Sequence, residues 1–272
     1  MQARLLLLLL LSSSIYAAPA ERIISLAPHA TELAYAAGLG DQLIAVSEHS
    51  DYPIAAQKLE KVSNYQGLKL ERIIALQPDL IIAWPSGNPA RELDKLKQFG
   101  FNIYDTNTGT LDDIASNIEQ LSQYSQDPSV GNHSATQFRE KLRQLKQTYQ
   151  TDSPVRYFYQ LSATPLMTVA NGKWPSEVFS FCGGVNIFEN SSVSYPQIGK
   201  ELVLLRDPDV IFTSEHRVAE DNTWHDWQGS LTAVRESHIW SLNSDWLNRP
   251  TIRTLNAVEE ICQYFEKVRQ NR

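Results

Sequence analysis

Residues 71–84 read ERIIALQPDLIIAW, and residues 201–214 read ELVLLRDPDVIFTS. The two stretches lie 130 positions apart (201 − 71 = 130) and share a leading glutamate, a Pro-Asp pair and an apolar run after that pair. In each stretch the proline ends a helical segment, and the apolar run has the length and composition of a buried strand. The chain therefore repeats one helix-to-strand unit, and the repeat has two interpretations. It marks only where a helix stops and a strand starts, with glutamates that the helix dipole favours, or it places one acidic unit in each of two lobes.

Short apolar runs alternate with helical patterns along the rest of the chain. Most of the runs are continuous, as in strands that helices cover on both faces. The expected strands are residues 22–26, 43–47, 80–84, 102–105, 156–161, 210–214 and 239–243. Between them, Thr110 is placed to cap a helix over residues 111–124. The alternation predicts an α/β fold with two Rossmann-like lobes and parallel sheets.

The segment SATQFREKLRQLKQTYQ, residues 134–150, has a different pattern. Ser134 and Gln137 form a capping-box pair, which predicts that a helix begins at Ser134. Its apolar residues form one narrow stripe, typical of a helix that rests on a surface: Phe138, Leu142, Leu145 and Tyr149. We expect one long connector helix within residues 131–153, between an N-terminal lobe (18–130) and a C-terminal lobe (154–272).

The first residues are typical of a secretory signal peptide. Arg4 precedes an unbroken leucine run at residues 5–11, which is far shorter than the roughly 20 residues of a membrane span, and small residues follow. We expect cleavage after Ala17, which leaves about 255 residues (272 − 17) and, without Arg4, a formal charge of −8 instead of −7. An exported acidic protein with no basic run is a poor partner for nucleic acid or an anionic membrane.

The chain has two cysteines, Cys182 and Cys262. In an oxidising compartment an even pair favours one disulfide, and the spacing does not match a CxxC metal or redox site. In the chain-entropy model, closing a loop of this size stabilises the folded protein by about 4 kcal/mol.

Motifs for catalysis are missing. The sequence has no G-x-S-x-G, Gly-rich phosphate loop or H-E-x-x-H, so a two-lobed hydrolase would have no recognisable nucleophile and base. Histidines are scattered, at positions 29, 49, 133, 216, 225 and 238. A metal site that gathers some of them with Glu48, Asp51 or Glu215 is one interpretation, and chance scatter is the other. We predict a protein that is not an enzyme and has no resident metal.

Four aromatic residues lie in loop-like settings. Trp84 ends an expected strand, Tyr65 and Tyr195 lie in polar turns, and Trp246 follows the last expected strand. Any one of them could simply cover a loop against the core. Ligands of open α/β sheets bind at the carboxyl ends of the strands, so together these residues favour a large, flat, partly apolar ligand between the lobes.

Several segments resemble exported substrate-binding proteins of ABC importers for haem, siderophores and corrinoids. The resemblance begins with RIISLAPHATELAYAAGLGDQLIAVS (22–47), SDYP (50–53) and LERIIALQPDLIIAW (70–84). It continues with YQGLKLERI (65–73), CGGVNIF (182–188), YPQIGKE (195–201) and SDW (244–246), and the corrinoid-binding members are the most similar. The resemblance implies a periplasmic monomer that captures cobalamin (vitamin B12) and delivers it to a permease dimer with ATPase subunits. A haem- or siderophore-binding protein of the same architecture is the alternative.

The resemblance also implies roles for particular positions. The family's corrin-facing aromatics match Tyr65, Trp84 and Tyr195, and its C-terminal ligand loop matches Asp245, Trp246, Leu247, Asn248 and Arg249. Its disulfide matches Cys182 and Cys262. Its two surface glutamates, which meet arginines of the permease, match Glu71 and Glu201.

At three positions the chain departs from the family pattern. Tyr65 and Tyr195 stand where tryptophan is usual, which keeps a ring and adds a hydroxyl. His49 stands where the family has a ligand-contacting tyrosine. Three interpretations of His49 remain open: a hydrogen bond to a corrin amide, ligation of cobalt, or a shift toward haem.

Overall fold

A computed structural model describes residues 19–170, 172–214, 224–227 and 229–272. The expected signal peptide and its cleavage site after Ala17 lie outside the described residues, as do Glu215 and His216. Within the described ranges, no helix combines the length and the apolar character that crossing a membrane requires.

The first half of the chain forms a six-stranded sheet in the order β4-β3-β2-β1-β5-β6. Its strands are β1 (Ile23–Ser25), β2 (Leu43–Ser47), β3 (Glu60–Asn64), β4 (Gly67–Leu68), β5 (Leu80–Ala83) and β6 (Ile103–Asp105). All neighbours are parallel except β3 and β4, which form a hairpin. We call the part of the molecule around this sheet the N-terminal lobe.

A second sheet, in the order β10-β7-β11-β12, is parallel throughout. It contains β7 (Val155–Gln160), β10 (Gly184–Asn186), β11 (Val210–Ser214) and β12 (Ile239–Leu242), and β8 (Ser162–Ala163) pairs with β9 (Leu166–Met167) in a small hairpin. We call the part around this sheet the C-terminal lobe. The parallel α/β architecture expected from the sequence is confirmed.

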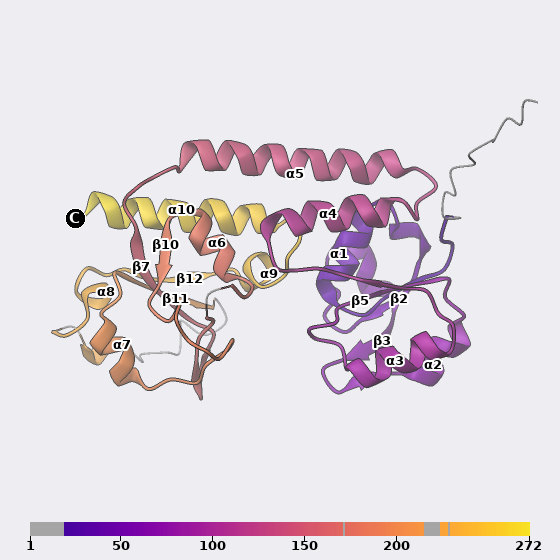
Figure 1. Ribbon diagram of the computed structural model, residues 1–272, viewed down its shortest axis with the longest axis horizontal. Coiled ribbons are helices and arrows are strands. Elements are labelled where there is room, and N and C mark those ends of the chain that lie inside the picture. The colour runs from indigo at the N-terminus through magenta and orange to yellow at the C-terminus, as the bar shows by residue number, and fades with distance from the viewer. Residues whose placement is uncertain (1–18, 171, 215–223, 228) are drawn as a thin grey trace, which may run out of the picture.

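Helices cover both faces of the sheets, which explains why the strands are continuously apolar (Figure 1). One layer runs across both lobes: α1 (Pro28–Ala36), α4 (Leu111–Ser122), α5 (Pro128–Thr148), α6 (Ser176–Phe181) and α10 (Thr254–Gln270). On the opposite side lie α2 (Leu70–Leu76) and α3 (Ala90–Gln98) in the N-terminal lobe, and α7 (Lys200–Arg206) and α8 (Thr232–Arg235) in the C-terminal lobe. The short α9 (Ser244–Leu247) follows β12.

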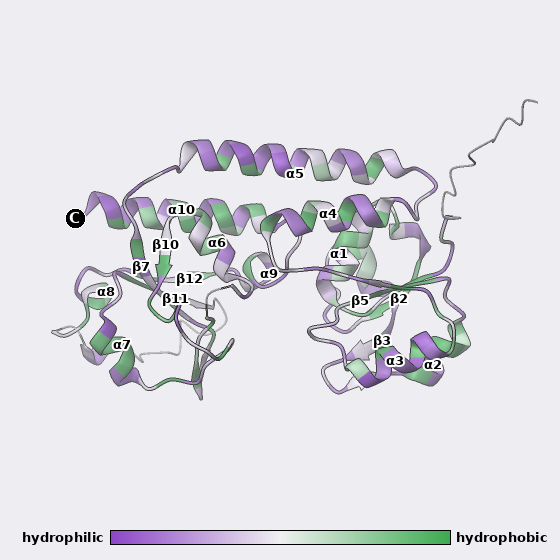
Figure 2. Ribbon diagram, viewed as in Figure 1, coloured by the Kyte–Doolittle hydropathy of each residue, from purple (hydrophilic) through white to green (hydrophobic). Residues whose placement is uncertain are grey.

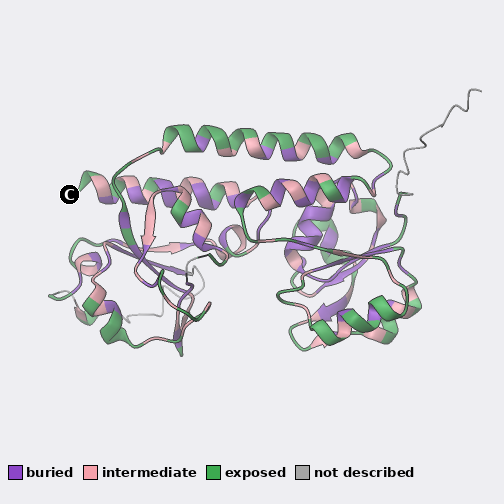
Figure 3. Ribbon diagram, viewed as in Figure 1, coloured by how far each residue is buried: buried purple, intermediate pink, exposed green. Residues whose placement is uncertain are grey.

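The largest apolar core is shared by the two lobes. It runs from Ile23 and Leu33 in the N-terminal lobe, past Phe138 on α5, to Phe212 and Phe265 in the C-terminal lobe. Figure 2 shows that most residues of α5 are hydrophilic, and Figure 3 shows that most of them are exposed. The helix therefore covers the common core with one narrow stripe, as the sequence pattern predicted.

The expected beginning of this helix was wrong. The helix begins at Pro128, where Asp127 caps it by accepting a hydrogen bond from the Ser129 amide at 3.0 Å. Ser134 lies inside the helix, and its hydroxyl donates to the Val130 carbonyl at 3.0 Å. The Asp-Pro pair is the stronger start signal because proline at the first helical position needs no hydrogen-bond partner for its nitrogen.

The repeated motif has the same structural role in both lobes. Asp79 accepts a hydrogen bond from the Arg22 amide at 3.1 Å, and Asp209 accepts one from the Arg156 amide at 2.7 Å. The guanidinium of Arg22 donates to the Leu76 carbonyl at the end of α2, and that of Arg156 donates to carbonyls at the end of α7. Each unit thus attaches its glutamate-bearing helix to the first residues of the neighbouring strand.

The predicted disulfide is confirmed. Cys182, at the end of α6, is bonded to Cys262 on α10 across a sequence separation of 80 residues. It ties the final helix to the C-terminal lobe.

Candidate ligand-binding site

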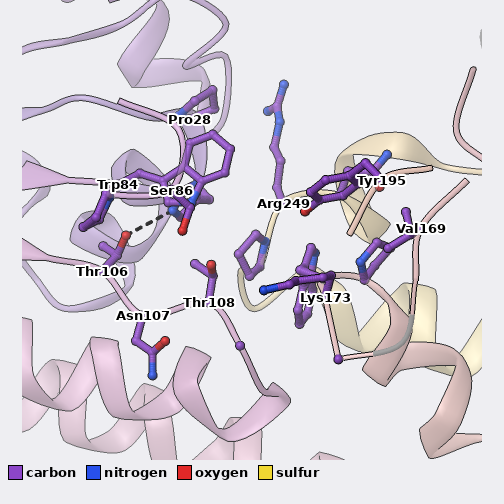
Figure 4. A pocket seen from close by; sticks show the side chains of 18 of the residues that line it. Pro28, Trp84, Ser86, Thr106, Asn107, Thr108, Val169, Lys173, Tyr195 and Arg249 are labelled. Carbon is purple, nitrogen blue, oxygen red and sulfur yellow. Dashed lines mark hydrogen bonds between the residues drawn. The ribbon is translucent and has the colours of Figure 1, made fainter. Parts of the chain in front are cut away.

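A cleft of about 890 Å³ lies between the two lobes (Figure 4). Its N-terminal wall consists of Pro28, His29, Trp84, Pro85, Ser86 and residues 105–109, and its C-terminal wall consists of Leu161, Val169, residues 172–175, Tyr195 and residues 248–250. This volume is within the range of small-molecule and cofactor sites.

The topology of the sheets places these residues together. Trp84 directly follows β5, Thr106 follows β6 and Leu161 follows β7. Carboxyl ends of parallel strands meet at one edge of a sheet, so the loops after them gather there. Each lobe turns that edge toward the other, and the cleft is the space between the two edges.

Trp84 is held by its own loop. Its backbone amide donates to the Asn88 side-chain oxygen at 2.7 Å, and the Asn88 side chain donates in turn to the Leu26 carbonyl at 2.9 Å. Gly87 lies so close that a Cβ built on it would be 2.0 Å from a carbon of the indole ring. An added Cβ at Gly87 would collide with the ring, so glycine at this position permits the present orientation of the Trp84 indole.

His29 packs against the same ring. Its imidazole is buried and meets the Trp84 indole edge-on, with ring centroids 5.2 Å apart and an interplanar angle of 88°. Its Nε2 lies 3.3 Å from the Thr106 hydroxyl. Burial, together with the nearby positive charge of Arg249, lowers the pKa of His29 from 6.5 to about 3. The imidazole is therefore neutral at ordinary pH.

The C-terminal wall supplies a second set of rings. Tyr195 remains 46% exposed at the cleft, which leaves its ring available to a ligand. The Trp174 indole is fixed by a hydrogen bond from its Nε1 to the Leu247 carbonyl at 2.8 Å. Figure 4 shows Tyr195 across the cleft from Trp84, with the Lys173 ammonium extending toward the space between the walls. A flat ligand can therefore contact rings from both lobes.

Arg249 joins the lobes at the cleft. Its guanidinium lies 2.6 Å from an Asp51 carboxylate oxygen, 3.0 Å from Asp245 and 3.5 Å from Glu32. Arg253 donates to the other oxygen of Glu32 at 2.8 Å. The hydrogen bond from Arg249 is the main reason why the pKa of Asp51 lies below its ordinary value. We call this group of five charged residues the interlobe clasp.

The residues expected to contact a ligand fall into three groups. Trp84, Tyr195, Asn248 and Arg249 line the cleft. Asp245 belongs to the clasp, Trp246 packs against the shared core, and Leu247 is fully buried. Tyr65 is 91% exposed on the β3–β4 hairpin, and His49 is exposed with a positive φ of 61°; neither is part of the cleft lining. Contact of the last two with a ligand stays a prediction.

Sequence reasoning missed several residues of the cleft. His29 lies in the first turn of α1, Thr106 lies just after β6 and Trp174 lies just before α6, and no local sequence pattern marks these three residues. Thr106 directly follows a parallel strand, as Trp84 does, so its place at a strand end also indicates a ligand-binding position.

No cluster of three or more His, Cys, Asp or Glu side chains is arranged to hold a metal ion in the part of the chain that the structure describes. The two glutamates of the repeated motif lie elsewhere. Glu71 on α2 and Glu201 on α7 are exposed, on the side of the molecule opposite α5 (Figure 1).

Comparison with known proteins agrees with this architecture. A family model described as "Periplasmic binding protein" matches residues 23–245. The vitamin B12-binding protein of Vibrio parahaemolyticus is 65% identical over 254 residues, which cover 93% of this chain and 92% of that protein.

Solved structures give the same picture. The crystal structure of the periplasmic vitamin B12 binding protein BtuF of Vibrio cholerae superimposes with a TM-score of 0.91 at 60% identity, covering 93% of this chain and 99% of that one. The periplasmic heme binding protein HutB of Vibrio cholerae has a TM-score of 0.73 at 21% identity, over 90% of this chain and 98% of that one. The second likeness concerns the fold alone.

Proposed function

Because the chain belongs to the periplasmic binding protein family, we propose that it captures vitamin B12 in the cleft between its lobes and delivers it to an ABC importer. The proposal takes its ligand from relatives named as vitamin B12-binding proteins at 60% identity and above. These relatives are binding proteins rather than enzymes, and we infer that this chain likewise carries no catalytic activity.

One observation carries the proposal: the cleft presents fixed aromatic rings on both walls. Trp84 is held by Asn88 and Gly87 on one wall, and Tyr195 and Trp174 lie on the other. A corrin is a large, amphipathic, roughly planar ring with amide side chains around its edge. Its faces can pack against the aromatic rings, and its amides can form hydrogen bonds with polar groups such as Asn248 and the Ser86 hydroxyl.

The main role that we assign to Arg249 is to hold the two walls of the cleft in position around the ligand. Its guanidinium already pairs with Asp51 and Asp245, so we assign it to holding the walls at the right separation while its remaining cleft surface meets the ligand. We assign Tyr65 and His49 to the rim of the cleft, where they would meet the exposed edge of a bound corrinoid. His49 is then best suited to a hydrogen bond with a corrin amide.

Delivery requires a second surface. We propose that Glu71 and Glu201, one on each lobe, pair with cationic residues of the permease, whose ATPase subunits drive transport. Exposed pairs of this kind set orientation and association rate more than affinity. We further propose that residues 1–17 direct export to the periplasm, where the mature protein acts as a monomer without inserting into the membrane.

Calorimetric titration of the mature protein with cyanocobalamin tests the binding site. We expect one binding site per chain and a loss of at least tenfold in affinity for Trp84→Ala, since the indole is a central apolar contact of the cleft. Phe99→Ala removes a ring that is 64% exposed outside the cleft and serves as the matched control. Equal affinities of the two variants would remove Trp84 from the site.

A further inference from the structure

The two helices that carry the glutamates are built alike. Each is seven residues long, has its glutamate at the second position and ends at a residue with left-handed backbone, Gln77 in one and Asp207 in the other. An arginine at the beginning of the neighbouring strand donates to the carbonyls at each helix end: Arg22, just before β1, or Arg156, in β7. The two lobes therefore present the same helix in the same way.

The outward faces of these two helices differ. On α7, the residues one and four positions after Glu201 are Leu202, which is 43% exposed, and Leu205, which is 82% exposed. On α2, the corresponding residues after Glu71 are Arg72 and Ala75. Arg72 is paired with Glu60 at 2.7 Å, so the α2 face is polar. Hydrophobic residues on α7 are visible in Figure 2, and Figure 3 shows exposed residues on the same helix.

Two neighbouring exposed leucines leave apolar surface in water, which is unfavourable, so a partner that covers them gains free energy. Residues three positions apart on a helix are neighbours, so Leu202 and Leu205 form one apolar patch beside Glu201. Within the residues that the structure describes, neither Glu201 nor Glu71 forms an ion pair, so the apolar patch is what distinguishes α7 from α2. An apolar patch beside an uncompensated carboxylate complements a surface that has a cation next to an apolar recess.

We propose that Glu201, Leu202 and Leu205 form the dominant contact with the importer permease, and that the α2 face around Glu71 is the weaker contact. The inference rests on the proposed function and adds a rank order to it. Both glutamates steer the protein onto the permease, whereas burial of Leu205 slows its release. The patch is thus an apolar anchor on α7 that the corresponding helix α2 lacks.

Binding to a vitamin B12 importer in lipid nanodiscs tests the rank order, with cyanocobalamin-loaded protein and a flow-based measurement of association and dissociation. We expect Leu205→Ser to raise Kd at least tenfold, mostly through faster dissociation, which corresponds to a loss of about 1.4 kcal/mol. Glu201→Gln is expected to weaken binding more than Glu71→Gln. Ile54→Ser is the matched control, because Ile54 is 77% exposed in the N-terminal lobe, away from α7.

Each other result has a defined meaning. Unchanged binding of Leu205→Ser together with a loss for Glu201→Gln overturns the apolar anchor and leaves the acidic docking in place. A larger loss for Glu71→Gln reverses the rank order. If the wild-type protein binds empty nanodiscs and Leu205→Ser does not, the patch binds lipid. If the wild-type protein forms a dimer on a sizing column and Leu205→Ser does not, the patch binds a second copy of the chain. Either result overturns the proposal. Cobalamin titrations of every variant show separately whether ligand capture itself is intact.

Discussion

Trp84 shows how a site residue is prepared at the scale of single side chains. Its place at the end of β5 could be predicted from the sequence, because a strand followed by Pro85 and a glycine-containing loop ends at the edge of the sheet. Its supports could not be predicted. His29 comes from the first turn of α1 and Thr106 from the loop after β6, and no local pattern connects them with Trp84.

Gly87 is the most sensitive position around this ring. In Gly87→Ala, the new Cβ would lie 2.0 Å from an indole carbon, so the ring must turn out of its present orientation. We expect the affinity for cyanocobalamin to fall about tenfold, measured by calorimetry, while the far-ultraviolet circular dichroism is retained. Gly229→Ala is the control, since an added Cβ there has no neighbour within 4 Å. A tight-binding Gly87→Ala variant would mean that ring orientation does not limit affinity.

His29 predicts a pH dependence of stability. The unfolded chain protonates this histidine below its ordinary pKa of 6.5, whereas the folded protein keeps it neutral to about pH 3. Over that interval the unfolded state binds more protons, so the stabilisation is complete above pH 6.5 and falls by about 1.4 kcal/mol per pH unit as the pH decreases.

The His29→Phe variant isolates this contribution. Urea unfolding between pH 7 and pH 4 should show a smaller decrease in stability for the variant than for the wild type. His133→Asn, which changes an exposed histidine on α5, should leave the wild-type dependence unchanged. Parallel curves for wild type and His29→Phe would show that the buried imidazole accepts its proton at an ordinary pH.

At the scale of helices and strands, long periodic segments were predictable and short polar ones were not. The capped helix after Thr110 is present with the expected stripe, because its apolar spacing repeats over three turns. Strand β3, with the sequence EKVSN, has too few apolar residues to stand out, and β10 has only three residues. The beginning of α5 was misplaced because two start signals, Asp127-Pro128 and Ser134, lie close together.

The interlobe clasp was also beyond prediction. Arg249 and Asp51 are 198 residues apart in the sequence, so their contact depends on how the two finished lobes meet. The sequence marked Arg249 as a ligand contact, whereas in the structure this side chain donates hydrogen bonds to Asp51 and forms ion pairs with Asp245 and Glu32. Helices α1 and α10 are thereby joined, since Glu32 lies on α1 and Arg253 immediately precedes α10.

Glu32 is the central carboxylate of the clasp. Its side chain is 4% exposed and neutralises both Arg249 and Arg253, so Glu32→Gln leaves two partly buried guanidinium groups with less compensation. We expect the free energy of unfolding to fall by about 3 kcal/mol, measured by urea denaturation. Glu140→Gln, at an exposed pair with Arg143 on α5, should leave the unfolding midpoint nearly unchanged. Equal midpoints for the two variants would contradict a stabilising role of the clasp.

At the scale of the whole molecule, three connections restrict how far the lobes can move. The apolar core continues from one lobe to the other, α5 lies across both, and the clasp joins them beside the cleft. The sequence indicated the connector helix, from which we infer limited closure. The shared core could be recognised only from the packing of the finished structure. A preformed cleft loses little freedom when it binds its ligand, which favours affinity.

Small-angle X-ray scattering of the mature protein measures this rigidity. We expect the radius of gyration to stay the same, within error, when cyanocobalamin is added to saturation. The Glu32→Gln variant, with a weakened clasp, should show a larger radius without ligand than the wild type does. A marked contraction of the wild-type protein on ligand addition would show that the lobes close as in hinged binding proteins.

The ligand itself is the central claim, and co-elution tests it most directly. Purified mature protein is mixed with cyanocobalamin, or in parallel with haemin, and separated on a sizing column with detection of visible absorbance. We predict stoichiometric corrinoid absorbance under the protein peak and none from haemin. Haemin absorbance without cobalamin would make this a haem-binding protein and draw attention to His49, and absorbance from neither ligand would contradict the proposed substrate.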